Sequence, residues 1–129
     1  MSATSNSKDV HALLVHILHP YGLHCPQGHR LANGQAPHRT RRSDLPDYRC
    51  RECGAVYNLF SGTHWNNTRY SCATVFGILR GVAQGRPTTA IAAQLGINRA
   101  SLARRRHLIL EEIEALASHT TRAILENVN

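Results

Sequence analysis

Two short segments of the chain carry cysteine and histidine at spacings that suit one metal ion. Cys50 and Cys53 are separated by two residues, and Gly54 can take the positive φ that turns the backbone back on itself. The other segment places His29 four positions after Cys25. Three thiolates and one neutral imidazole make a tetrahedral site for Zn²⁺. We therefore expect one structural zinc ion, bound by these two cysteine segments and His29.

The fourth ligand has competitors. A second cysteine would more usually stand at position 28, where this chain has Gly28, so His29 ranks first. His24 ranks second, because adjacent residues of an extended segment point in opposite directions and would not easily share an ion with Cys25. Cys72 ranks third and is better explained as a small apolar residue on a buried helix face. A redox pair or a disulfide is disfavoured, since turns and short strands flank the thiols and no signal peptide precedes them.

The paired ligands predict a small zinc ribbon over residues 21–63. Residues 30–47 would form a hairpin or loose loop between the two ligand pairs, and residues 55–60 a closing strand. A ribbon of this size cannot bury enough apolar surface to fold alone. It therefore needs the metal ion or a helix packed against it.

Residues 1–20 are expected to form a disordered leader followed by an amphipathic helix. The leader covers residues 1–7, which are rich in Ser, Thr and Asn. Apolar residues at spacings of three and four, ending before Pro20, predict the helix: Val10, Leu13, Leu14, Ile17 and Leu18. Its histidines have no acidic or cysteine neighbours that would complete a second metal site, and they are expected to face solvent: His11, His16 and His19.

Positive charge is concentrated in the middle of the chain. The 129 residues carry a net charge of +7, and residues 61–110 contain seven arginines and no acidic residue. Residues 111–129 carry one arginine and four glutamates. Arginine suits bidentate contacts with phosphate and guanine, and repulsion among so many arginines is tolerable chiefly beside a polyanion. This distribution favours nucleic acid as the partner of residues 61–110.

Residues 64–110 have the pattern of a helix-turn-helix domain of three helices. An apolar stripe over about residues 71–84 predicts the first, supporting helix, which Gly85 and Pro87 stop. The spacing of the apolar residues, the glycine at Gly96 and the apolar Ile97 between the two helices then match the second and third helices of such a domain.

Thr88 is expected to cap the second helix, and Gly96 to end it in the left-handed conformation. Asn98 is expected to cap the third helix, whose first buried residue is Leu102. In a helix-turn-helix the N-terminal turns of this last helix enter the major groove of double-stranded DNA. We therefore expect base-edge contacts near its start and phosphate contacts at the helix openings. The predicted DNA-binding residues are Arg86, Thr88, Asn98, Arg99, Ala100, Ser101, Arg104, Arg105 and Arg106.

Residues 111–129 are expected to form a C-terminal helical extension, with the third helix continuing to about Leu116. Its apolar stripe is too short and too polar to predict a coiled coil: Ile109, Ile113, Leu116, Thr120 and Ala123. We prefer an arm packed on the protein's own core, and homodimerisation stays open.

The runs over residues 48–63 and 91–99 resemble the N-terminal half of bacterial insertion-sequence transposases of the DDE type. The resemblance covers about residues 21–116. In that family a zinc ribbon and a helix-turn-helix recognise the terminal inverted repeats of the element, and an RNase H-like catalytic domain follows. By analogy, Cys25, Cys50 and Cys53 match metal ligands, and residues 99–105 match the recognition helix. The chain ends where the catalytic domain would begin, and we expect no enzymatic activity from it.

The expected fold is α+β and mostly α, with a zinc ribbon, a helix-turn-helix domain, and flanking N- and C-terminal helices. The expected function is zinc-stabilised, sequence-specific binding of double-stranded DNA. The alternatives are a standalone transcriptional regulator and a protein–protein adaptor that uses the zinc ribbon. Because no apolar run approaches the roughly 20 residues that span a bilayer, we expect a soluble protein of the bacterial cytoplasm, associated with the nucleoid.

Overall fold

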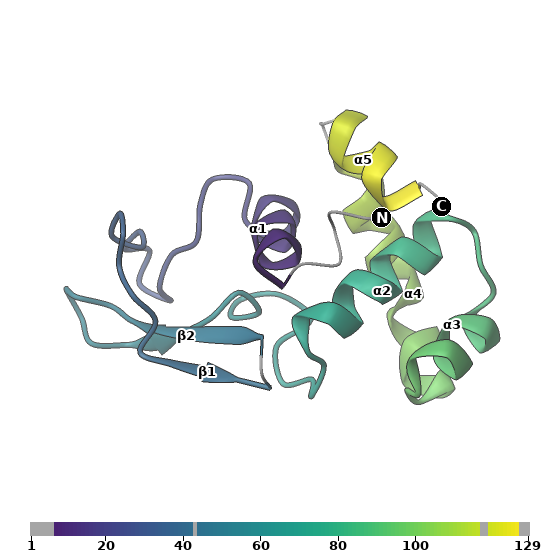
Figure 1. Ribbon diagram of the computed structural model, residues 1–129, viewed down its shortest axis with the longest axis horizontal. Helices are drawn as coiled ribbons and strands as arrows, with labels where there is room; N and C mark the ends of the chain where they lie inside the picture. Colours follow the sequence, from purple (N-terminus) through teal and green to yellow (C-terminus); the bar gives the residue numbers. More distant parts are fainter. Residues whose placement is uncertain (1–6, 43, 117–118, 127–129) are drawn as a thin grey trace. The chain divides into compact units, whose positions relative to one another are not determined.

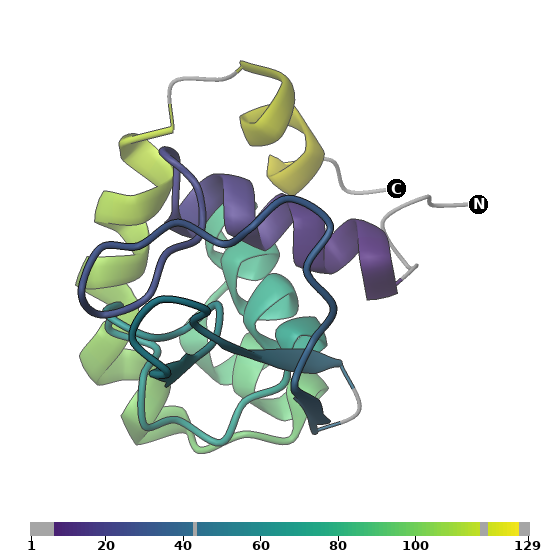
Figure 2. The ribbon, with the colours of Figure 1, turned by 90° about the vertical axis from the view of Figure 1, so that its left-hand side faces the viewer.

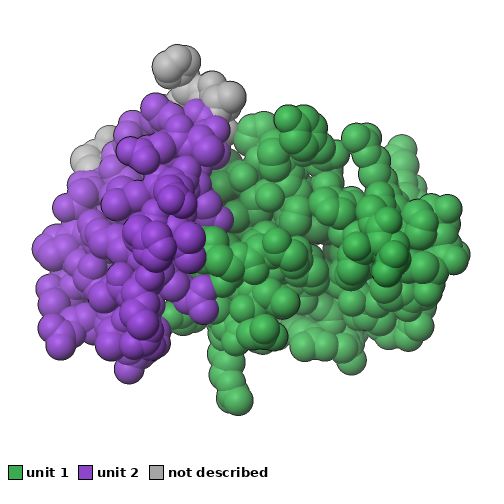
Figure 3. All heavy atoms as spheres, turned by 180° about the vertical axis from the view of Figure 1, so that it is seen from behind, with its two compact units in different colours: residues 1–73 green, residues 74–129 purple. Residues whose placement is uncertain are grey.

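The computed structural model describes residues 7–42, 44–116 and 119–126. These residues form five helices and one three-stranded antiparallel sheet (Figure 1), so the fold class is α+β and mostly helical, as predicted. No described helix is long and apolar enough to cross a membrane. The chain forms two compact units, residues 1–73 and 74–129, which Figure 3 colours separately. In order, the elements are α1 (Ser7–Leu18), β1 (Arg39–Arg41), β2 (Leu45–Arg49), β3 (Val56–Tyr57), α2 (Cys72–Ala83), α3 (Thr88–Leu95), α4 (Arg99–Glu114) and α5 (His119–Glu126).

The predicted N-terminal helix is confirmed as α1. Its buried side chains, Val10, Leu14 and Ile17, recur at spacings of four and three, which places them on one face. The helix begins at Ser7, inside the predicted leader, and residues 1–6 of that leader lie outside the described residues.

The prediction that the histidines of α1 face solvent is wrong for His19. This side chain is buried, and its Nε2 donates a hydrogen bond to the carbonyl oxygen of Leu59 at 2.6 Å. His19 follows the last residue of α1, and Gly22 donates to its carbonyl oxygen at 2.9 Å, so His19 lies where the helix ends in a turn. His16 is exposed as predicted, whereas His11 is half-buried, and burial lowers its pKa despite the opposing charge of Asp44.

The sheet has the strand order β1-β2-β3, with both pairings antiparallel. Figures 1 and 2 show β1 and β2 side by side. Arg39 pairs with Asp47 across β1 and β2, and Tyr48 pairs with Tyr57 across β2 and β3. The predicted hairpin is therefore present as β1 and β2. The predicted closing strand is shorter than expected, because the side chain of Asn58 accepts a hydrogen bond from the amide of Phe60 and turns the chain immediately after β3.

Asp47 is a buried charged residue at the centre of this sheet. Its side chain is 1% exposed, and its Oδ2 accepts hydrogen bonds from Nε of Arg39 at 2.7 Å and from Nε of Arg41 at 2.6 Å. Its Oδ1 accepts from Nδ2 of Asn58 at 3.0 Å. Burial alone would raise the pKa of this carboxyl, but the three donors outweigh burial and hold the pKa below its ordinary value.

In the other unit, two glycines of α2 allow α3 to pack closely. A Cβ at Gly81 would lie 2.8 Å from Cγ1 of Ile91, and one at Gly77 would lie 3.0 Å from Cδ2 of Leu95. The predicted apolar stripe of α2 is buried: Val75, Ile78, Leu79 and Val82. The packing of α3 against α2 therefore requires these two glycines, which the apolar stripe alone does not indicate.

The turn between α3 and α4 follows the prediction, whereas the start of α3 does not. Gly96 adopts φ 67°, and Asn98 caps α4 by accepting a hydrogen bond from the amide of Ser101 at 2.8 Å. Leu102 is fully buried. At the start of α3, however, the cap position is Pro87, and Thr88 is the first helical residue and not the cap. Proline supplies the extended backbone there without a capping side chain.

The C-terminal extension is a separate helix. α4 ends at Glu114, and Arg122 of α5 donates from Nη2 to the carbonyl oxygens of Glu114 at 3.2 Å and Leu116 at 3.0 Å. These bonds satisfy carbonyl groups that a helix leaves unpaired at its C-terminus. The predicted stripe is interrupted, since Ala123 is exposed while Leu125 is fully buried.

Replacing Asp47 with Asn is expected to lower the free energy of unfolding by about 1–3 kcal/mol at neutral pH, because it removes charge-assisted hydrogen bonds from a buried site. The folded-state pKa of Asp47 lies below the unfolded value. The contribution is therefore complete above about pH 4 and is lost as the pH falls through the folded-state pKa.

Denaturant titrations over a pH series measure this difference. The exposed Asp9 provides the control, and Asp9→Asn should change stability little. A deficit of Asp47→Asn that stays constant down to the most acidic sample would contradict the assignment.

Candidate metal centre

The first ligand pair lies in a tight turn after α1. The amide of Gly28 donates to the carbonyl oxygen of Cys25 at 2.9 Å, and the amide of Cys25 donates to the carbonyl oxygen of His29 at 2.9 Å. Gly28 has φ 90°, a backbone conformation that a cysteine would adopt only with strain. The side chain that the turn directs toward Cys25 therefore comes from His29, one residue later.

The second pair lies in the turn that leads from β2 to β3. The amide of Cys50 donates to the carbonyl oxygen of Ala55 at 2.8 Å, and Gly54, at φ 76°, closes the turn by donating to the carbonyl oxygen of Cys50 at 2.9 Å. The amides of Glu52 and Cys53 point at Sγ of Cys50, at 3.4 and 3.5 Å. Such backbone donors stabilise a thiolate.

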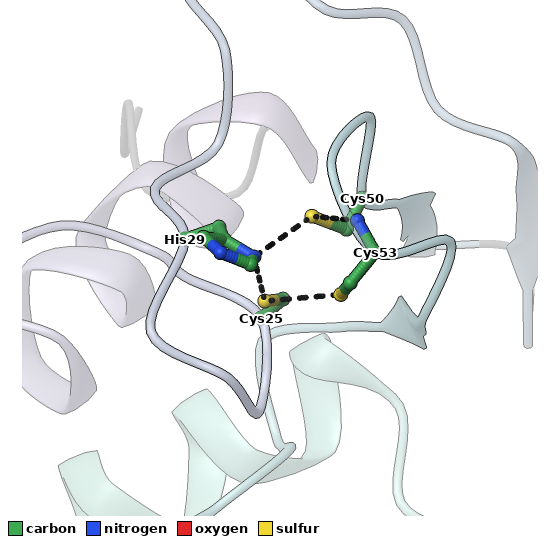
Figure 4. A group of neighbouring side chains, drawn as sticks. All are labelled: Cys25, His29, Cys50 and Cys53. Carbon is green, nitrogen blue, oxygen red and sulfur yellow. Dashed lines mark hydrogen bonds between the residues drawn. The ribbon is translucent and has the colours of Figure 1, made fainter.

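The two turns bring the four predicted ligands together (Figure 4). The ligand atoms of Cys25, His29, Cys50 and Cys53 all lie within 4.8 Å of one another. Nδ1 of His29 is 3.4 Å from Sγ of Cys25 and 3.5 Å from Sγ of Cys50, and Sγ of Cys25 is 3.7 Å from Sγ of Cys53. Tetrahedral coordination at zinc bond lengths separates sulfur from nitrogen by about 3.5 Å and sulfur from sulfur by about 3.8 Å. The four residues are thus close enough, and suitably spaced, to hold one metal ion.

Hydrogen bonds and burial shift the pKa values of all four side chains in the cluster. A hydrogen bond from the Cys53 amide lowers the pKa of Cys50 to about 6. Burial would raise the pKa of Cys25, but backbone hydrogen bonds from His29 and Gln27 reverse the shift and lower the pKa. The amide of Ala55 lowers the pKa of Cys53, yet burial and the neighbouring thiols outweigh it and raise the pKa. Hydrogen bonds to Cys50 and Cys25 raise the pKa of His29.

An apolar cluster packs around two of the four candidate ligands, Cys25 and Cys50. Cys25 and Cys50 are buried with Leu23, Tyr48 and Tyr57, and Leu31 packs against them. His29 is half-buried and Cys53 is exposed, so the cluster meets solvent on the Cys53 side.

The competing ligands lie elsewhere. His24 is exposed, and its Nδ1 lies 3.2 Å from the carbonyl oxygen of Gly22. Cys72 is buried at the start of α2, where burial raises its pKa to about 12, as expected for a small apolar residue. All four cysteines fall within the described residues, and none forms a disulfide.

The predicted DNA-binding residues fall into two groups, both in residues 74–129. At the start of α4, Arg99, Ala100 and Arg104 are exposed, Nη2 of Arg104 lies 3.3 Å from Oγ of Ser101, and Arg105 is half-buried. The second group consists of Arg86, Thr88 and Arg106, in which Arg106 contacts the other two.

Arg106 connects α4 to the segment that precedes α3. Its Nη1 donates to Oγ1 of Thr88 at 3.1 Å, and its Nη2 donates to the carbonyl oxygen of Arg86 at 2.8 Å. The side chain of Arg86 contacts Oε1 of Gln94. No sequence pattern indicated this arrangement, because 18 and 20 residues separate Arg106 from its two partners.

The chain was compared with family models, curated proteins and solved structures, and none of them matches it.

We expect one metal ion per chain, as measured by elemental analysis of the purified protein. Cys50→Ser should lose the ion and destabilise residues 1–73, because a serine hydroxyl does not replace a thiolate ligand. Cys72→Ala is the matched control and should retain the ion, since Cys72 lies outside the cluster. A metal-free wild-type protein, or full metal content in Cys50→Ser, would refute this site.

Proposed function

We propose that the chain is a zinc-stabilised protein that binds double-stranded DNA with sequence specificity. The observation that carries the proposal is the exposed basic face at the start of α4, where Arg99 and Arg104 lie on the outside and Leu102 on the inside. A helix that presents arginines in its first two turns, on a segment free of acids, suits the major groove.

The arrangement of α3 and α4 supports reading these elements as a helix-turn-helix. Gly96 ends α3 in the left-handed conformation, and the amide of Ile97 donates to the carbonyl oxygen of Ala92 at 3.1 Å. Asn98 then caps α4, so only residues 96–98 connect the two helices. A turn this short holds the second helix at a defined angle to the first, which is what places its N-terminal turns against base edges.

In this proposal the arginines have different tasks. Arg99 reads base edges together with Ala100 and Ser101, because it is exposed at the first helical position. Arg86 binds backbone phosphate. Arg106 positions the start of α3 against α4 through its two hydrogen bonds, in addition to its charge near phosphate.

The metal is proposed to be one structural Zn²⁺. Three thiolates and an imidazole match the soft and borderline ligands that zinc takes, and four protein ligands leave no open position for a reactive water. The ion would hold residues 21–63 in a zinc ribbon. We therefore propose a structural role for zinc and no catalysis by this chain.

The biological setting that fits these features is recognition of DNA ends, as in the N-terminal region of insertion-sequence transposases. A transcriptional regulator would use the same contacts. The adaptor alternative is less favoured, because few large apolar side chains are exposed among the described residues, and they belong to different segments of the chain: Tyr21, Val56 and Leu110.

Binding to a random-sequence duplex is expected to weaken steeply as salt is added, because arginine–phosphate contacts release counterions. Fluorescence anisotropy of the labelled duplex over a salt series measures the slope of log K against log[salt]. A flat response, or no binding at low salt, would reject DNA binding in favour of the adaptor.

Arg99→Ala and Arg86→Ala are expected to separate base reading from phosphate binding. With a duplex selected from a random pool, Arg99→Ala should lose about 1–3 kcal/mol of preference for the selected duplex over random sequence. Arg86→Ala should weaken both duplexes alike and reduce the salt slope by about 1. Equal losses on both duplexes for both variants would show that α4 does not read bases. A palindromic selected site would indicate a homodimer, and an asymmetric one would favour end recognition.

A further inference from the structure

A second set of arginines, outside the predicted DNA-binding residues, lies on the exposed hairpin of residues 1–73. All residues of β1 are exposed, and the side chains of Arg39 and Arg41 are 53% and 45% exposed. Residues two apart on a strand share a face, and both Nε atoms bind the same oxygen, Oδ2 of Asp47. One carboxylate thus orients two guanidinium groups and leaves a net positive charge.

The geometry of this pair leaves its terminal nitrogens available. Each guanidinium uses Nε for Asp47, and within the described residues no partner is found for the Nη atoms of Arg39 or Arg41. A guanidinium that is already held in place loses less conformational entropy when it binds an anion. The two guanidinium groups are therefore preorganised to bind an anion that offers several acceptor oxygens.

A small polar hollow lies beside Arg41. Its volume is about 100 Å³, which suits a compact group such as a phosphate and is too small for a nucleoside. Positively charged and amide side chains dominate the lining: Arg41, Arg42, Asn58, Phe60, Trp65, Asn66, Asn67 and Thr68.

The backbone around this hollow is strained at two points. Arg42 has φ 50° and Asn67 has φ 67°, and in the part of the chain that the structure describes these are the only non-glycine residues with positive φ. Such conformations cost free energy and concentrate at functional sites. Nη1 of Arg42 also donates to the carbonyl oxygen of Tyr70 at 3.2 Å, which holds its guanidinium at the hollow.

We propose that this hairpin hollow binds one backbone phosphate of double-stranded DNA through Arg41 and Arg42, which line it together with Asn66 and Asn67. Arg39 does not line the hollow and adds its charge beside Arg41, on the same strand face and the same Asp47 oxygen. The proposal rests on the proposed function and extends it, because it gives residues 1–73 a DNA contact of their own. The contact reads no bases, since its donors converge on a phosphate-sized hollow and not on an extended surface.

The test uses the double variant Arg39→Gln/Arg41→Gln in the full chain. Glutamine places an N–H at the position of the arginine Nε, so the hydrogen bonds to Asp47 can persist while both terminal guanidinium ends are removed. The control is Arg30→Gln/Arg51→Gln, which removes the same charge from two exposed positions of the same unit. Metal content and melting curves verify that both variants are folded.

Binding of a random-sequence duplex is then measured over a salt series. The hairpin variant should lower the slope of log K against log[salt] by about 1 and weaken binding about fivefold near physiological salt, as loss of one phosphate contact predicts. The control should keep the wild-type slope. Equal slopes for the hairpin variant and wild type, or an equal loss in the control, would overturn the hairpin contact and leave DNA binding intact. Absence of binding by the wild-type protein would reject both.

Arg42→Gly gives an independent measurement. Glycine accepts the positive φ of this position without strain, so the variant should melt no lower than wild type. It removes a guanidinium from the hollow, so its salt slope should also fall by about 1. An unchanged slope in this folded variant would contradict the proposal.

Discussion

The convergence of four donor atoms from two turns is the constraint on which residues 1–73 depend. Thiols and an imidazole within 4.8 Å of one another gain little from mutual contact and become a strong point of attachment when they share an ion. The backbone of both turns supports this convergence. Gly28 and Gly54 take positive φ, and backbone amides lower the pKa of Cys50. The apolar cluster beside the site is small, so an ion shared by the four side chains would connect segments that packing alone would hold weakly.

A second interaction, at Asp47, organises the sheet next to this centre. One buried carboxylate binds Arg39 and Arg41 of β1 and Asn58 beyond β3, so it connects all three strands. The same interaction has a consequence at the surface. Because the arginines are bound through Nε, the terminal ends of their guanidinium groups are oriented toward solvent. The structural ion pair therefore also orients the guanidinium groups for the proposed phosphate contact. Stability and the proposed phosphate contact therefore share one residue.

The arginines of residues 74–129 differ in role: some form hydrogen bonds within the unit, and others are exposed at its surface. Arg106 and Arg122 use their guanidinium groups on backbone and side-chain acceptors within the unit, whereas Arg99 and Arg104 are exposed at the start of α4. The total positive charge, which first indicated a polyanionic partner, does not by itself distinguish these roles. The proposed DNA contacts rest on the exposed arginines, and the close packing of α3 on Gly77 and Gly81 holds the helices that carry them.

Local chemistry and periodicity determined much of the structure from the sequence alone. The four metal-ligand candidates, the presence of α1, the extent of α2, the left-handed Gly96 and the Asn98 cap all follow from patterns among residues a few positions apart. The burial of His19, the pairing of Asp47, the contacts of Arg106 and the separate α5 were decided by tertiary structure. Each depends on a partner that the fold supplies and the local pattern does not show: Leu59 for His19, β1 for Asp47, the start of α3 for Arg106, and the carbonyl end of α4 for Arg122. Contacts between neighbouring residues leave a pattern in the sequence, whereas long-range hydrogen bonds form only once the elements have packed.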